Sequence, residues 1–143
     1  MQLTTWFIAK EDEAEAIESI VTTEEHSPED WSHLELPLGQ LELMALSAAL
    51  RGAEDITEES TLEKPLVFRE EDGLLIARVV DTFLQALARV TDEGVTGLSV
   101  AWVERMDEES HEPEELRAIL SELVSFARQA VARRSPVLSL STF

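Results

Sequence analysis

Apolar residues along this chain follow two different periods, and each period predicts a different kind of element. Alternating or continuous runs of β-branched and aromatic residues predict strands over 3–9, 65–70, 73–79 and 136–142, with a brief extended piece at 34–37. Apolar positions three and four residues apart predict helices over 11–21, 38–51, 81–91, 95–108 and 113–133. Residues 53–64 follow neither period and are predicted to be a mobile connection.

The order of these elements predicts how they assemble. Strands at both ends, with helices between them, indicate that both ends join one sheet. Two apolar runs flank Glu71-Asp72-Gly73, and Asp-Gly is a strong signal for a hairpin turn. The helix over 113–133 has a continuous apolar stripe that we expect to pack on the sheet, made of Leu116, Ile119, Leu120, Leu123, Val124, Ala127, Ala130 and Val131.

The predicted fold class is therefore α+β, with residues 1–143 as one acidic domain. We expect a small, mostly antiparallel sheet covered by amphipathic helices, with a long C-terminal helix and then a final strand. One element is ambiguous, because Leu98, Val100 and Trp102 also alternate as in a strand. We favour a helix there because the segment continues to Glu109 without a break.

An acidic opening, a long amphipathic helix and a closing strand end the chain. They are Glu114-Glu-Leu-Arg-Ala-Ile-Leu-Ser-Glu-Leu-Val-Ser-Phe-Ala-Arg-Gln-Ala130 and Pro136-Val-Leu-Ser-Leu140. In this pattern, residues 80–141 resemble the YfbM-like family of small bacterial proteins, whose function is unknown. The resemblance implies a compact α+β bacterial domain and carries over no functional residue.

Charge changes this picture more than overall composition does. Thirty Asp and Glu oppose eleven Lys and Arg, which gives a net charge of −19. Residues 1–72 hold 19 acids and 4 bases, whereas residues 73–143 hold 11 acids and 7 bases. We expect no binding to nucleic acid or to an anionic membrane surface, because both require Lys and Arg. A basic protein partner would be attracted, although the charge is also compatible with a purely solubilising role.

Several classes of chemistry have no support in the sequence. The chain has no cysteine, which excludes disulfides, thiolate catalysis and cysteine-based zinc sites. We expect a cytoplasmic protein, because the first residues lack a basic region and no apolar run has the length of a membrane span. Glycine-rich phosphate loops, G-x-S-x-G, H-E-x-x-H and EF-hand spacings are all missing. We therefore expect no cofactor and favour a protein that is not an enzyme.

Three histidines are candidate metal ligands, and all lie in acidic stretches: His26, His33 and His111. One hypothesis is a small metal-binding protein or hydrolase that uses His26, His33 and nearby carboxylates. The alternative, which we favour, is that these histidines are solvated loop residues. Paired carboxylates add nothing here, because thirty acids place some pair at a catalytic separation by chance.

Trp31 differs from the other tryptophans because it lies in a polar, acidic segment, Pro28-Glu-Asp-Trp-Ser-His33. An exposed Trp among acids would resemble a binding hot spot for a basic surface. The alternative, which we favour for this residue, is that Trp31 folds back and covers the edge of the core. The candidate partner-binding residues are Trp31, Glu29, Asp30, Glu24, Glu25, Glu70, Glu71 and Asp72.

The leading functional hypothesis is a non-catalytic bacterial protein that binds a basic partner through residues 11–35 and 54–72. An immunity or antitoxin-type inhibitor is one concrete version, since nucleases present basic clefts. A homo-oligomeric structural protein is a third hypothesis. It is prompted by the surplus of apolar residues in the helix over 38–51, which would lie at the interface.

Overall fold

A computed structural model of the chain describes residues 3–38, 40–51, 63–105 and 112–142. Predictions that concern residues 53–62, residues 106–108 and His111 therefore lie outside the described residues. Within them, the predicted α+β single-domain fold is confirmed. Among the described helices, none combines the length and apolar character that crossing a bilayer requires.

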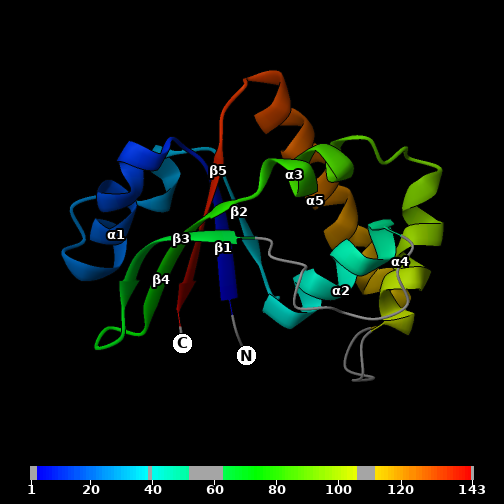
Figure 1. The fold of residues 1–143 in the computed structure, drawn as a ribbon, viewed down its shortest axis with the longest axis horizontal. Helices are drawn as coiled ribbons and strands as arrows, with labels where there is room; N and C mark the ends of the chain where they lie inside the picture. Colours follow the sequence, from blue (N-terminus) through cyan, green and yellow to red (C-terminus); the bar gives the residue numbers. More distant parts are fainter. Residues whose placement is uncertain (1–2, 39, 52–62, 106–111, 143) are drawn as a thin grey trace.

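The elements alternate along the chain much as their periodicity predicts (Figure 1). The strands are β1 (Leu3–Ile8), β2 (His33–Leu36), β3 (Glu63–Arg69), β4 (Leu74–Val79) and β5 (Val137–Thr142). The helices are α1 (Ala14–Thr22), α2 (Gln40–Arg51), α3 (Asp81–Ala88), α4 (Gly94–Glu104) and α5 (Pro113–Ala132), with short 3-10 turns η1 (Glu11–Glu13) and η2 (Pro28–Asp30). The brief extended piece expected at 34–37 is thus a true strand of the sheet.

The five strands form one sheet in the order β2-β1-β5-β4-β3, and every neighbouring pair is antiparallel. The first and last strands of the chain pair directly, from Leu3 opposite Thr142 to Ile8 opposite Val137. This confirms that both ends join one sheet. The last strand, β5, occupies its centre, between β1 and β4.

The sheet is covered on both faces, and the alternation of side chains along each central strand explains why. In β1, Trp6 and Ile8 enter a large apolar cluster with α2, α3, α4 and α5, whereas Phe7 enters a smaller cluster with Ala14 and Ile17 of α1. Figure 1 shows α1 on one side of the sheet and the other four helices on the opposite side. Three layers result, with the antiparallel sheet in the middle.

The predicted hairpin forms between β3 and β4, and its turn contains Gly73. Gly73 has a φ of 61° and donates its N–H to the carbonyl of Glu70 at 3.2 Å. A residue with a side chain would be strained at this φ, which accounts for glycine here. The hairpin therefore forms where the Asp-Gly pair predicts it.

The ambiguous segment is helical, as favoured, and becomes α4. Trp102 is fully buried and donates its indole N–H to the carbonyl of Glu42 in α2, at 2.8 Å. A strand would have sent Leu98, Val100 and Trp102 to one face, but Val100 is exposed. Packing against α2 and α5 thus selects the helix.

The predicted apolar stripe of α5 is buried at every position except Ile119 and Val131. Ile119 is half-buried at the cluster edge, and Val131, near the C-terminal end, is 42% exposed. Phe126, which the predicted stripe omits, is buried against Trp6 with ring centroids 6.4 Å apart. The buried face of α5 therefore includes Phe126 and leaves out Val131.

The apolar surplus of α2 is used within the chain. Its most apolar positions, Leu43, Ala45, Leu46 and Ala48, are buried, and Met44 and Leu50 pack against the same cluster. The feature that prompted the homo-oligomer hypothesis is therefore explained by the core of a single chain.

Replacing Ile17 with Ala tests whether α1 is a packed layer. Ile17 is fully buried under α1, so we expect its truncation to lower the free energy of unfolding by about 2–5 kcal/mol. Val21 in the same helix is 41% exposed, and Val21→Ala should change stability by less than about 0.5 kcal/mol. Urea unfolding of both variants measures the difference, and equal effects would contradict the packing described here.

Candidate functional site

Residues 10–30 contain nine Asp and Glu and one Lys, and they form most of one outer layer of the protein. Helical periodicity separates charge from core in this segment. Ala14 and Ile17 point to the sheet, while Glu11, Asp12 and Glu15 are exposed. The carboxylates of this layer are therefore displayed to solvent on the side away from the larger core.

The β3–β4 hairpin extends this acidic surface. Its turn carries Glu70, Glu71 and Asp72, all of which are exposed. The hairpin lies on the same side as α1 (Figure 1), and Arg69 Nε lies 3.5 Å from Glu18 Oε2 of that helix. We call residues 10–30 together with residues 70–72 the acidic layer. The structure thus brings the two groups of predicted acidic residues onto neighbouring elements.

The segment after α1 is held by local hydrogen bonds. Glu24 takes a φ of 58° and donates its N–H to the carbonyl of Ser19 at 2.7 Å, which closes the helix. Ser27 and Asp30 then form a reciprocal capping box around η2. These contacts keep the exposed residues Glu24, Glu25, Glu29 and Asp30 in the same part of the layer.

Trp31 is half-buried and packs against the smaller core cluster. Its ring meets Phe7 edge-on at 5.7 Å, and its Nε1–H donates to Glu13 Oε2 at 2.9 Å. Trp31 therefore covers the core edge, the alternative favoured above, rather than standing exposed among the acids. Sequence alone does not reveal Glu13 as its partner, because the two residues are 18 positions apart.

Among the described residues, Glu13 and Arg78 are the titratable groups whose pKa is clearly perturbed. The pKa of Glu13 is lowered below 4.5, first by the hydrogen bond from the Lys10 backbone N–H and then by the bond from Trp31. Both donors favour the ionised carboxylate. Glu13 thus joins η1 to the segment that carries Trp31.

The two described candidate metal ligands lie at different ends of an aromatic row. The ring centroids of His26 and Trp31 lie 5.7 Å apart with the planes tilted by 58°, and His26 Nδ1 lies 3.4 Å from Asp30 Oδ2. The ring centroids of His33 and Phe7 lie 6.2 Å apart. Among the described residues, no three His, Asp or Glu side chains are grouped so as to hold a metal ion. The predicted convergence of His26, His33 and described acids on one metal is therefore wrong.

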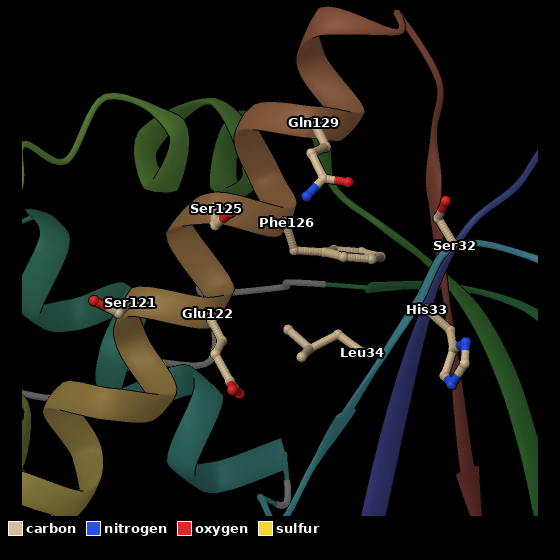
Figure 2. Close-up of a pocket in the computed structure, with 8 residues that line it drawn as sticks. All are labelled: Ser32, His33, Leu34, Ser121, Glu122, Ser125, Phe126 and Gln129. Carbon is tan, nitrogen blue, oxygen red and sulfur yellow. The ribbon is translucent and has the colours of Figure 1, made fainter.

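A groove of about 530 Å³ lies between the edge strand β2 and helix α5 (Figure 2). Leu34 of β2 and Phe126 of α5 form its apolar base, and polar side chains of α5 line the helix side. The lining residues are Ser32, His33, Leu34, Ser121, Glu122, Ser125, Phe126 and Gln129. Sequence reasoning missed this groove. Its only signal was the polar residues Ser121 and Ser125, one helical turn apart beside an apolar stripe.

A second cavity of about 320 Å³ lies between α3, the end of α5 and the start of β5. Arg78 and Arg134 line it, but Arg78 already contacts Asp81 at 3.1 Å and Glu11 at 3.5 Å. These partners, Asp81 first, raise the pKa of Arg78. Arg78 thus ties the acidic layer to α3.

The comparisons with known proteins identify no relative. No protein family, no curated protein and no solved structure matches this chain. The resemblance of residues 80–141 to the YfbM-like family stays a prediction.

Replacing Trp31 with Phe tests the link to Glu13. A lowered carboxyl pKa stabilises the fold above the ordinary value of 4.5, and this contribution is lost as the pH falls through the lowered pKa. We therefore expect Trp31→Phe to cost about 1 kcal/mol at neutral pH and less in acid, where the carboxyl is protonated. Urea unfolding across pH measures this.

The matched control repeats the substitution in a Glu13→Gln background. There, the cost of Trp31→Phe should no longer depend on pH, because the ionised acceptor is gone. A pH dependence that persists in this background would show that the hydrogen bond to Glu13 is not its cause.

Proposed function

We propose that this protein is a non-catalytic binding protein that engages a basic protein partner through its acidic layer. An inhibitor of the immunity or antitoxin type is the concrete version, in which the acidic layer covers a basic cleft of a toxic enzyme. The observation that carries the proposal is the clustering of exposed carboxylates on α1, on the segment after it and on the neighbouring hairpin turn.

The charge balance within the layer supports this role. Its nine acids in residues 10–30 face one Lys in the same segment, and Glu70, Glu71 and Asp72 add three more. Arg69 and Arg78 contribute ion pairs to Glu18 and Glu11. Many carboxylates held together on one surface make the local electrostatic potential more negative, which speeds the approach of a cationic partner.

The packing of the layer supports the proposal as well. Trp31, the capping box at Ser27 and the packing of Ile17 hold the carboxylate-bearing elements on the sheet. A pre-formed surface loses less conformational entropy on binding than a disordered acidic tail would. In this proposal Trp31 acts as a support for the layer, and the surrounding carboxylates make the contacts.

The test compares two variants that carry the same net charge. One neutralises the acidic layer through Glu24→Gln, Glu25→Gln, Glu29→Gln and Glu71→Gln. The other neutralises exposed acids elsewhere through Glu93→Gln, Glu104→Gln, Glu114→Gln and Glu115→Gln. Each variant and the unmodified protein serve as bait in pull-downs from source lysate at low and high salt.

We expect the unmodified protein to recover a basic protein at low salt. The acidic-layer variant should recover about tenfold less of it. The control variant should retain it, because the layer itself is unchanged. Recovery of no basic protein at either salt would reject the proposal. Equal losses from both variants would show that net charge alone, and no particular surface, attracts the partner.

A further inference from the structure

We propose that an extended, basic segment of the partner docks on the open edge of β2 as a sixth strand, with alternate side chains entering the groove beside α5. This inference rests on the proposed function and specifies where and how the partner is held. It depends on three features of the described residues: the backbone of β2, the groove, and the charges that flank both.

The backbone of β2 is arranged to accept a strand. Among the described strands, β2 pairs only with β1 and forms the end of the sheet. Ile8 N–H donates to the carbonyl of Ser32 at 2.9 Å, and hydrogen-bonded pairs alternate along an antiparallel ladder. By that alternation Leu34 bonds to β1, while His33 and Glu35 direct their N–H and C=O groups to the open edge.

The groove provides room for the side chains of an added strand. Leu34 faces the larger core cluster, so the side chains of a neighbouring strand on that face would lie beside Phe126 and α5. Figure 2 shows Leu34 and Phe126 at the base of this space, with Glu122 and Gln129 reaching from the helix. Strand addition of this kind takes affinity from the backbone and specificity from the pockets.

Charge selects a basic occupant. Glu35 is exposed on the edge strand, and Glu122 is exposed on the opposite wall of the groove. Because side chains alternate along a strand, Glu35 points to the face opposite Leu34 and the groove. Lys or Arg at alternate positions of the added strand would therefore lie beside Glu35 or, in the other register, beside Glu122. Arg133 lies at the far end, where its guanidinium donates to Ser32 Oγ at 2.8 Å.

The same charges oppose a second copy of this chain. Two β2 edges paired with each other would bring together strands that each carry an exposed Glu35, between molecules that each carry −19. Charges on an edge strand are a common device against self-association. The occupant favoured by this edge is therefore a different, cationic chain.

The acidic layer leads directly to this edge. Residues 24–30 run into Trp31, which packs on Phe7, and Phe7 is the neighbour of His33 across the β1–β2 ladder. A partner that covers the layer is thus positioned to lay a segment along β2. Steering by the layer and docking at the edge are two steps of the same encounter.

The first test uses two synthetic peptides of equal charge as probes. In one, Lys and Val alternate; in the other, the Lys-Pro peptide, Pro replaces Val and each Lys carries a backbone N-methyl group, so that no residue has a backbone N–H to donate. Binding is followed by the NMR signals and hydrogen exchange of the backbone amides of the uniformly labelled protein. We expect the Lys-Val peptide to bind and to slow exchange at His33 and Glu35, with the Lys-Pro peptide at least about tenfold weaker.

The second test removes one edge donor. Glu35→Pro deletes an N–H that points away from β1, so the sheet itself should remain, and Lys-Val binding should fall about tenfold or more. Glu35→Gln removes the same charge but keeps the backbone N–H, so it should weaken Lys-Val binding clearly less than Glu35→Pro does. If Glu35→Pro fails to fold, the exchange data on the unmodified protein still decide the question.

The outcomes separate this inference from the proposed function. Equal binding of both peptides, or binding without protection at His33 and Glu35, would overturn strand addition and leave an acidic surface that attracts cations. Failure of the Lys-Val peptide to bind would also overturn it. Recovery of no basic protein by the unmodified protein at either salt, by contrast, would overturn the proposed function and this inference together.

Discussion

The central strands of this sheet are buried on both faces, and the rest of the structure follows from that constraint. Neighbouring residues such as Trp6 and Phe7 must each find an apolar layer, so the sheet needs helices on both sides. The two polar side chains buried in these central strands, Thr4 and Ser139, each have a hydrogen-bond partner, whereas the buried indole nitrogen of Trp6 has none among the described residues. Thr4 donates its hydroxyl to the carbonyl of Leu38 at 2.9 Å, and Ser139 donates to Ala77 at 3.4 Å.

This constraint also explains where the charge lies. One thin layer, α1 with its flanking turns, must cover the face that Phe7, Leu138 and Leu140 present. Its inner positions are small or aliphatic, and the remaining positions are free to carry carboxylates, which are costly to bury. A strongly acidic surface and a complete core thus coexist, because helical periodicity places the apolar residues on the inner face of α1 and the acids on its outer face.

Local patterns predicted the elements well, whereas long-range contacts largely escaped prediction. Helix α5 and the hairpin at Gly73 depend on residues close in sequence, so periodicity and turn chemistry were sufficient to predict them. The groove needs β2 beside α5, which are far apart in the chain. Trp31 offered two interpretations, and choosing between them required its contacts with Phe7 and Glu13. Among the described residues, His26 and His33 do not converge with acids on one metal site, because their proximity in sequence does not fix the directions of their side chains.

The position of β5 has a consequence for how the chain acquires its fold. During synthesis, the β1–β2 and β3–β4 pairs emerge before the strand that joins them. Until residues 137–142 arrive, β1 and β4 each lack their neighbour at the centre of the sheet, and closing it requires a contact between segments at opposite ends of the chain. Such closure is slow, because the entropy of a long loop is lost before the contact forms. During that interval, repulsion between chains that each carry −19 would oppose the pairing of these incomplete sheets with one another.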